Sequence, residues 1–171
     1  FDYVKYTMNY LKISVGIFLA LAASRFIPHT PNFTSLIALS FYIPLIFGVK
    51  FIPILIFCFV VSDFFIGFHS TTFFTWGSVL IIGLITQFFK NNIFLRLIGA
   101  VSASLIFFIF TNFGVWVLGS YGYSYDGLIT CYIAAIPFYT NTLLSTLIYS
   151  VIIETILNFY KSNKKNSILK H

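Results

Sequence analysis

Hydrophobic residues fill this chain in six long runs, and short polar stretches connect the runs. The runs cover residues 11–27, 33–47, 51–68, 73–89, 93–118 and 138–160. Within each run the apolar residues are continuous rather than alternating, and most runs approach the ~20 residues with which an α-helix crosses a membrane. A helix satisfies its own backbone hydrogen bonds in lipid, whereas an open strand does not. The pattern predicts an all-α, polytopic membrane protein, a bundle of about six transmembrane helices.

Two parts of the pattern are less regular. The run at 33–47 is short and contains Pro44, so a tilted or re-entrant helix is an alternative to a full span. A short apolar piece at 128–136 is followed by Pro137, and we expect the last helix to begin after this proline because proline interrupts a helix. The prediction is therefore one transmembrane domain over residues 1–171, with a basic tail at 161–171.

Composition supports the membrane assignment. Hydrophobic residues make up 59% of the chain and charged residues 8%, with a mean hydropathy of +0.96; soluble domains carry about 25% charged residues. The net charge is +6, and the basic residues lie at the ends of the runs, where anionic lipid headgroups are the natural partner. We therefore expect membrane lipids and no nucleic acid among the partners.

The basic residues predict the orientation, because lysine and arginine concentrate on the cytoplasmic side of membrane proteins. With an even number of spans, Arg25 alone lies on the outer side. This leaves nine of the ten basic residues on the other side. They are Lys5, Lys12, Lys50, Lys90, Arg96, Lys161, Lys164, Lys165 and Lys170. We expect both termini to be cytoplasmic.

Polar residues then gather at the outer ends of the runs. They are Arg25, His29, Asn32, Asp63, His69, Asn112, Trp116 and Asn141. Ionisable groups at membrane depth are costly and usually face a bundle interior or a wet cavity. The hypothesis is a polar, partly aromatic cavity for a small ligand, since no acidic ring or carbonyl filter of an ion pore is visible.

Simpler interpretations of these residues stay open. Arg25 and Asp63 can pair with each other, and His29 and His69 can be interfacial residues without a ligand. A metal site built from Asp63 and the two histidines is disfavoured, because their spacing is not a metal signature. Trp116 fits an aromatic belt at the membrane surface, with ligand stacking as the alternative.

Other chemistry finds little support. Cys58 and Cys131 are isolated, which predicts packing roles and no disulfide framework. The chain has no HExxH, GxSxG or paired acidic motif, so we expect neither an enzyme nor a cofactor. Glu154 is expected to snorkel or to pair with Lys161. No nucleotide-binding motif is present, so an ATP-driven step requires another chain.

Small residues mark a possible contact surface on the first helix. Gly16, Ala20 and Ser24 recur at four-residue spacing, and such a stripe lets another helix backbone approach closely in lipid. Packing within the bundle and docking of a partner membrane protein are both consistent with it. A similar group at residues 99–104 has the same ambiguity.

Four sequence motifs resemble a known family. They are ASRFIPHTPNFT at 23–34, SDFFIGFH at 62–69, TNFGVW at 111–116 and CYIAAIPFYTNT at 131–142. In this order, and over roughly residues 15–155, they resemble a small bacterial inner-membrane family carried as a domain of unknown function. That family is in turn similar in size, helix count and layout to the substrate-binding S components of energy-coupling-factor (ECF) vitamin transporters.

The resemblance implies a membrane substrate-capture subunit, or a solitary transporter, for a vitamin-like molecule bound on the extracytoplasmic side of a bacterial inner membrane. The eight outer polar residues match the family motifs and would be the ligand-binding set. Gly16, Ala20 and Ser24 would dock a transmembrane coupling subunit, although this stripe departs from the familiar alanine-only version. The alternative is a structural or accessory subunit of a larger membrane complex.

Overall fold

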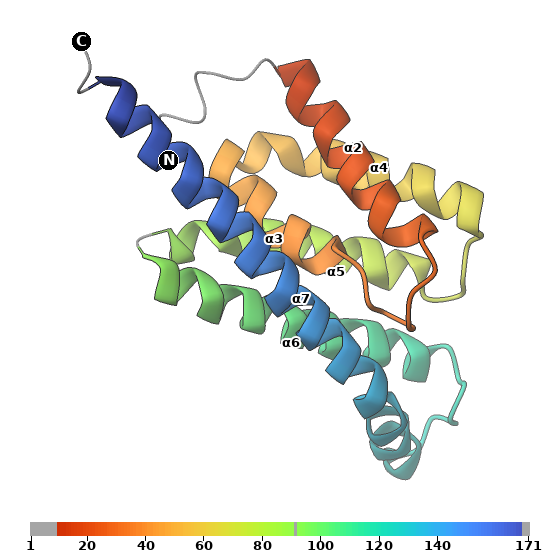
Figure 1. Cartoon of the computed structure of the whole chain (residues 1–171). Coiled ribbons are helices and arrows are strands. Elements are labelled where there is room, and N and C mark those ends of the chain that lie inside the picture. Colours follow the sequence, from red (N-terminus) through yellow and green to blue (C-terminus); the bar gives the residue numbers. More distant parts are fainter. Residues whose placement is uncertain (1–9, 91, 169–171) are drawn as a thin grey trace.

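The computed structural model describes residues 10–90 and 92–168, with residues 10, 11 and 164–168 described by their backbone alone. This part of the chain is all-α (Figure 1). The helices are α2 (Tyr10–Phe26), α3 (Leu36–Phe47), α4 (Ile52–Ile66), α5 (Thr72–Ile85), α6 (Ile93–Val117) and α7 (Tyr125–Ile168). Two 3-10 segments, η1 (Val49–Phe51) and η2 (Thr86–Phe89), adjoin α4 and α5.

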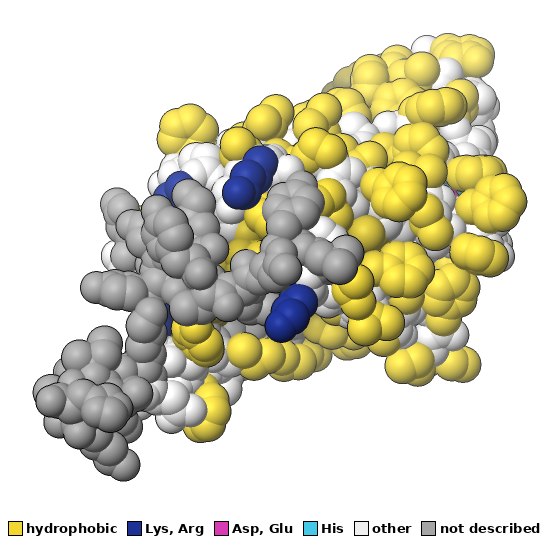
Figure 2. All heavy atoms as spheres, turned by 90° about the horizontal axis from the view of Figure 1, so that it is seen from above, with side chains coloured by type: hydrophobic (Ala, Val, Ile, Leu, Met, Phe, Trp, Pro, Cys, Tyr) yellow, Lys and Arg dark blue, Asp and Glu magenta, His cyan; other side chains and the backbone are white. Residues whose placement is uncertain are grey.

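Four helical segments are long and apolar enough to cross a membrane: Val49–Ile66, Thr72–Phe89, Ile93–Val117 and Tyr125–Asn163. The first three lie close to the predicted runs. Large hydrophobic side chains such as Leu19 and Phe57 are exposed on the outside of the bundle, at 59% and 67%. Figure 2 shows apolar side chains covering one face, with lysine or arginine side chains toward one end. The chain is a multi-pass membrane protein.

Helix α3 is the centre of the bundle and not a full span. Its residues from Leu36 to Ile46 are all buried. A helix of 12 residues rises ~18 Å, well short of the ~30 Å hydrocarbon layer. The predicted span at 33–47 is therefore corrected to a short helix. Hydropathy did not distinguish these cases, because protein and lipid both accept an apolar helix.

The segment before α3 turns back into the bundle. Ser35, which precedes α3, lies with its Oγ 2.6 Å from the Oγ of Ser24 and also donates to the carbonyl of Ala20. Helix α3 thus begins beside the last turns of α2 rather than level with its end. Residues 27–35 form the connection and lie over the side of the bundle (Figure 1).

Helix α7 corrects the expected start at residue 138. It begins at Tyr125, continues through Pro137 and reaches Ile168, so the expected tail from residue 161 continues this helix. Contacts with α6 hold the helix on both sides of the proline. Before it, Tyr132 Oη donates to Ile109 O at 2.7 Å; after it, Glu154 pairs with Arg96. These contacts offset the cost of a proline within the helix.

The Arg96–Glu154 ion pair lies inside the bundle. Arg96 Nε and Nη2 donate to the two carboxylate oxygens of Glu154 at 2.6 and 2.7 Å, and both side chains are buried. This corrects two expectations: Arg96 is not a surface charge, and Glu154 does not snorkel, because its carboxylate is bound to Arg96. The reason is position, since Ser150, Glu154 and Leu157 follow one another on a buried stripe of α7.

The small residues at 99–104 pack within the bundle. Ala100, Ala103 and Ser104 are fully buried. A Cβ added at Gly99 would lie 2.4 Å from Phe41 Cζ, so the α6 backbone approaches α3 closely there. Internal packing is therefore the correct interpretation of this group.

Candidate ligand-binding cavity

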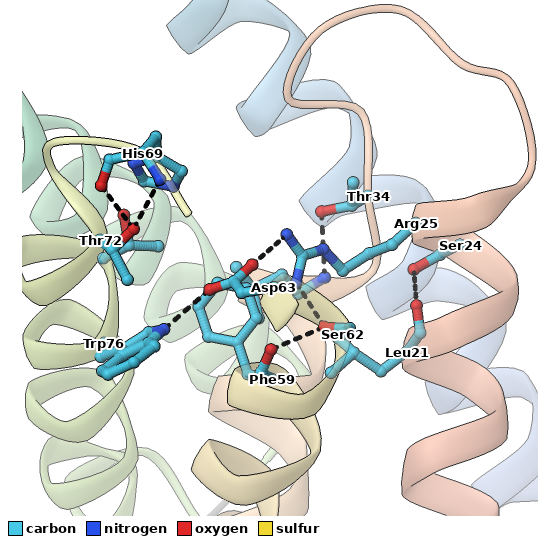
Figure 3. A network of polar contacts seen from close by, with 12 residues as sticks. Leu21, Ser24, Arg25, Thr34, Phe59, Ser62, Asp63, His69, Thr72 and Trp76 are labelled. Carbon is cyan, nitrogen blue, oxygen red and sulfur yellow. Dashed lines mark hydrogen bonds and ion pairs between the residues drawn. The ribbon is translucent and has the colours of Figure 1, made fainter. Parts of the chain in front are cut away.

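Arg25 is held rigidly at the end of α2. Its Nη2 donates to Asp63 Oδ1 at 2.6 Å, its Nη1 donates to the hydroxyl of Ser62, and its Cζ lies 4.5 Å from the ring centroid of Phe59 (Figure 3). All three partners belong to α4. A planar guanidinium held by a carboxylate, a hydroxyl and an aromatic face has a fixed orientation. The pairing of Arg25 with Asp63, left open by the sequence, is confirmed.

Both carboxylate oxygens of Asp63 accept hydrogen bonds from other side chains. Its side chain is fully buried, and its second oxygen, Oδ2, accepts a hydrogen bond from Trp76 Nε1 on α5 at 2.8 Å (Figure 3). Asp63 therefore joins α2, α4 and α5 rather than facing a ligand. Trp76 is not among the predicted site residues, although its indole N–H inside an apolar helix generally needs an acceptor and was a usable signal.

A cavity of about 480 Å³ opens beside Arg25. It lies at the end of the bundle that carries the connections 27–35, 67–71 and 118–124, which we call the loop end (Figure 1). Five of the eight predicted ligand-binding residues line it: Arg25, His29, Asn32, His69 and Asn112. Aromatic residues including Phe59, Phe108 and Tyr139 complete much of the wall. The structure thus brings together residues from separate motifs.

The other three predicted residues do not line the cavity. Asp63 lies behind Arg25, as described above. Trp116 Nε1 donates to Ser124 O at 3.3 Å and so fastens the connection between α6 and α7. Asn141 Nδ2 donates to Pro31 O at 3.0 Å and fastens the connection before α3 to α7. All three therefore position the parts that form the cavity wall.

The polar groups of the wall have specific capacities. Asn112 Nδ2 donates to Phe108 O at 2.7 Å, whereas its Oδ1 makes no hydrogen bond to the described residues. His29 Nδ1 lies 2.7 Å from Thr30 O, and His69 Nδ1 lies 3.0 Å from Thr71 Oγ1. One nitrogen of each imidazole is therefore fixed locally, and Nε2 is the atom that can meet a ligand.

Asn32 shapes the rim of the cavity through its backbone. Its φ of 63° lies in the left-handed region, which asparagine tolerates better than most residues. The backbone N–H of Phe33 donates to Thr30 O at 3.0 Å, closing the turn. Over residues 10–90 and 92–168, no group of three or more His, Cys, Asp and Glu side chains could hold a metal ion.

The sequence model of a family of unknown function (DUF6580) matches residues 5–168. The chain belongs to this family. No curated protein and no solved structure matches it. The resemblance to a family of unknown function is thus confirmed. The further similarity to ECF S components stays a prediction.

The wall of the cavity of this DUF6580 protein includes one thiol, Cys131, for which the sequence predicts only a packing role. Cys131 lines the wall and is buried, with its Sγ 3.4 Å from Asn112 O. Threonines from three helices and two connections also reach the wall: Thr34, Thr71, Thr75, Thr111 and Thr142. The sequence signal was weak, since threonines also occur elsewhere in the apolar runs.

The small-residue stripe of the DUF6580 protein is partly exposed on the outside of α2 and partly buried. Gly16 and Ala20 are exposed, and a Cβ added at Gly16 would meet nothing within 4 Å. Ser24 is buried, and its hydroxyl donates to Leu21 O at 3.0 Å. The surface open to another helix therefore includes Gly16 and Ala20, whereas Ser24 belongs to the contact with Ser35.

Proposed function

We propose that this DUF6580 protein captures a small molecule in the loop-end cavity, as the substrate-binding subunit of a membrane transporter or as a solitary transporter. The observation that carries the proposal is the fixed guanidinium of Arg25 at the wall of a cavity of about 480 Å³. Ligand pockets typically measure about 300–1,000 Å³ and combine mostly apolar walls with a few convergent polar groups. This cavity has that character.

The wall chemistry favours a neutral or singly anionic polar ligand. Asp63 compensates the charge of Arg25, so the cavity lacks the uncompensated cluster of arginines and lysines that a polyphosphate would require. Asn112 Oδ1 offers an acceptor and the His29 and His69 imidazoles can donate or accept. Phe108 and Tyr139, whose ring centroids are 4.8 Å apart, offer faces for a flat group.

The proposal places the cavity on the extracytoplasmic side of a bacterial inner membrane. The described lysines lie toward the end of the bundle opposite the loop end. Lys12 and Lys161 are in the parts of α2 and α7 remote from the loop end, Lys50 is in η1, and Lys90 follows η2. The buried Arg96 no longer contributes to this asymmetry. Although α3 is short, residues 27–47 still lead the chain from the loop end to Lys50 at the other end, so the number of crossings stays even. The remaining distribution therefore satisfies the positive-inside rule with the cavity outside and both termini in the cytoplasm.

Native mass spectrometry of the chain in lipid nanodiscs, combined with thermal shifts across a panel of vitamins and their precursors, tests this proposal. We expect a co-purified or stabilising small molecule that Asn112→Leu removes. The matched control is Asn158→Leu, because Asn158 is exposed on α7 and does not line the cavity. Equal ligand retention by both variants, or no bound molecule and no shift with any compound, contradicts the proposal.

A second candidate function is that of an accessory subunit of a larger membrane complex. The exposed Gly16 and Ala20 favour it, because exposed small residues on a helix in lipid allow a partner helix to approach closely. Gly16→Phe should then abolish cross-linking to a partner chain in native membranes, whereas Val15→Phe, at an already bulky exposed position, should retain it. Unchanged partner capture by Gly16→Phe counts against this docking surface.

A further inference from the structure

A second hollow lies in the side of the bundle, and we call it the α2–α7 groove. It has a volume of about 500 Å³. Ala20 and Ala23 of α2, Leu39 of α3, and Ile152, Ile153 and Ile156 of α7 line it. Helix α2 packs on α4 and α3 rather than on α7, so the groove remains open between α2 and α7.

The groove offers almost no polar partner. Its two serines bind each other through their hydroxyls at 2.6 Å, and they also bond to backbone carbonyls of α2. A polar ligand or a stable water requires several unpaired donors or acceptors, and besides the two serines the wall has only the Tyr149 hydroxyl and, at the loop end, the His29 imidazole. Because the groove lies beside the membrane-spanning part of α7, a hydrocarbon chain is the occupant with matching chemistry.

The groove adjoins the loop-end cavity. His29 lines both of them. Along α7 the cavity takes residues from Cys131 to Thr142, and the groove takes residues from Tyr149 to Ile156. At 1.5 Å per residue, Thr142 and Ile156 lie ~21 Å apart along the helix. The polar cavity therefore lies toward the loop end, and the apolar groove lies nearer the middle of the membrane. A lipid headgroup and its hydrocarbon chain have the same order in one bilayer leaflet.

A hydrocarbon chain fits this groove better than a partner helix does. The connection 27–35 crosses to α7 at the loop end of the groove, where Asn141 Nδ2 binds Pro31 O at 3.0 Å. A helix with its side chains is about 10–12 Å wide and needs an uninterrupted face along its length. A flexible chain needs only the narrow space over Ala20 and Ala23, and His29 is the residue at which the groove meets the cavity.

We propose that the ligand of this protein is an amphiphile, with its polar head in the loop-end cavity and its hydrocarbon chain in the α2–α7 groove. This rests on the proposed function of the cavity and specifies its substrate class. The ligand then enters sideways from the outer leaflet between α2 and α7. Arg25 and Asn112 select the head, and the groove selects the chain by its length.

Photo-crosslinking of the full chain in phosphatidylcholine vesicles tests this inference. The probe is a sixteen-carbon fatty acid with a diazirine in the chain and a terminal alkyne. We expect saturable labelling of the α7 peptide containing Tyr149–Ile156, with competition by unlabelled long-chain but not four-carbon fatty acid. Ala20→Phe should lose this labelling. Leu19→Phe should retain it, because Leu19 is exposed on the same helix but does not line the groove.

Three outcomes overturn the inference. Labelling that does not saturate, and that equals the labelling of exposed Ile109 on α6, shows contact with bulk lipid only. A protein partner cross-linked through the groove shows a helix as its occupant. If Ala20→Phe retains a short molecule without a hydrocarbon chain and Asn112→Leu loses it, the capture function stands but the ligand is not an amphiphile. If Asn112→Leu releases nothing bound to the wild-type chain, the capture function itself fails.

Discussion

Asn141 and Pro31 are 110 positions apart in the chain and joined by one hydrogen bond, from Asn141 Nδ2 to Pro31 O at 3.0 Å. The bond fastens the connection between α2 and α3 to the side of α7. This connection carries His29 and Asn32, which line the cavity, and it borders the loop end of the α2–α7 groove. One half-buried amide thus controls the position of a wall shared by both hollows.

Asn141→Ala should loosen this connection without unfolding the bundle. A hydrogen bond of this kind contributes about 0.5–1.5 kcal/mol, so the melting temperature should fall only slightly. Hydrogen–deuterium exchange should increase at residues 28–35 and stay unchanged at residues 67–71, which serve as an internal control. Unaltered exchange at residues 28–35 contradicts a fastening role for Asn141.

Asp63→Asn should destabilise the loop end strongly. The substitution removes the charge that compensates Arg25, whose side chain is only 13% exposed. Breaking a buried ion pair by neutralising one partner costs about 3–5 kcal/mol, because the other charge stays behind. Thermal unfolding in nanodiscs measures the loss, and Asp126→Asn is the control, since Asp126 is exposed.

The double variant Arg25→Leu/Asp63→Leu separates stability from binding. Replacing both partners by apolar residues of similar size generally recovers stability, because no uncompensated charge remains. The double variant should therefore melt at a higher temperature than Asp63→Asn, although below the wild type, because the Trp76 indole N–H loses its acceptor. It should lose the bound ligand, since the fixed guanidinium is absent. Full ligand retention by the double variant removes Arg25 from the binding site.

Hydropathy predicted the helices that pack on the bundle on one side and face lipid on the other. It did not predict the buried short helix α3 or the continuation of α7 through its proline. The predicted runs 51–68, 73–89 and 93–118 lie close to the observed segments. The 33–47 run is equally apolar, yet in the structure it is a short buried helix, since burial by protein and burial by lipid require the same side chains. Pro137 suggested a boundary, but contacts with α6 hold α7 together on both sides of it.

The sequence predicted which residues gather near the candidate site, but not how their side chains contact one another. Polarity at the outer ends of the runs found Arg25, His29, Asn32, His69 and Asn112, which line the cavity. The same criterion included Asp63, because sequence alone does not show that Trp76 and Arg25 occupy both of its oxygens. Arg96 was assigned to a membrane surface because its buried partner lies 58 positions later in the chain.

Gly99→Ala and Gly16→Ala should have opposite effects. A Cβ at Gly99 would lie 2.4 Å from Phe41 Cζ and 2.7 Å from Phe89 Cγ, and Phe41 is fully buried and cannot move aside. Overpacking of this kind costs about 1–3 kcal/mol. At Gly16 an added methyl group meets nothing within 4 Å, and alanine favours a helix by up to about 1 kcal/mol over glycine. Thermal unfolding of both variants measures the contrast; equal melting temperatures contradict the close contact of α6 with α3.

The variants Glu154→Gln and Tyr42→Phe test two buried polar groups, of which only the Glu154 carboxylate has its hydrogen bonds formed. Glu154 binds Arg96 through both oxygens, so its neutralisation removes a carboxylate charge from a buried guanidinium and should cost about 3–5 kcal/mol. The Tyr42 hydroxyl is fully buried beside Glu154 and Ser150, but it is not in a well-formed hydrogen bond with either of them or with another described residue. Removing an unsatisfied hydroxyl eliminates a desolvation penalty, so Tyr42→Phe should keep or raise the melting temperature. A marked loss of stability in Tyr42→Phe would instead show that the hydroxyl supports the ion pair, and Glu154→Gln/Tyr42→Phe would then be less destabilised than the sum of the two single variants.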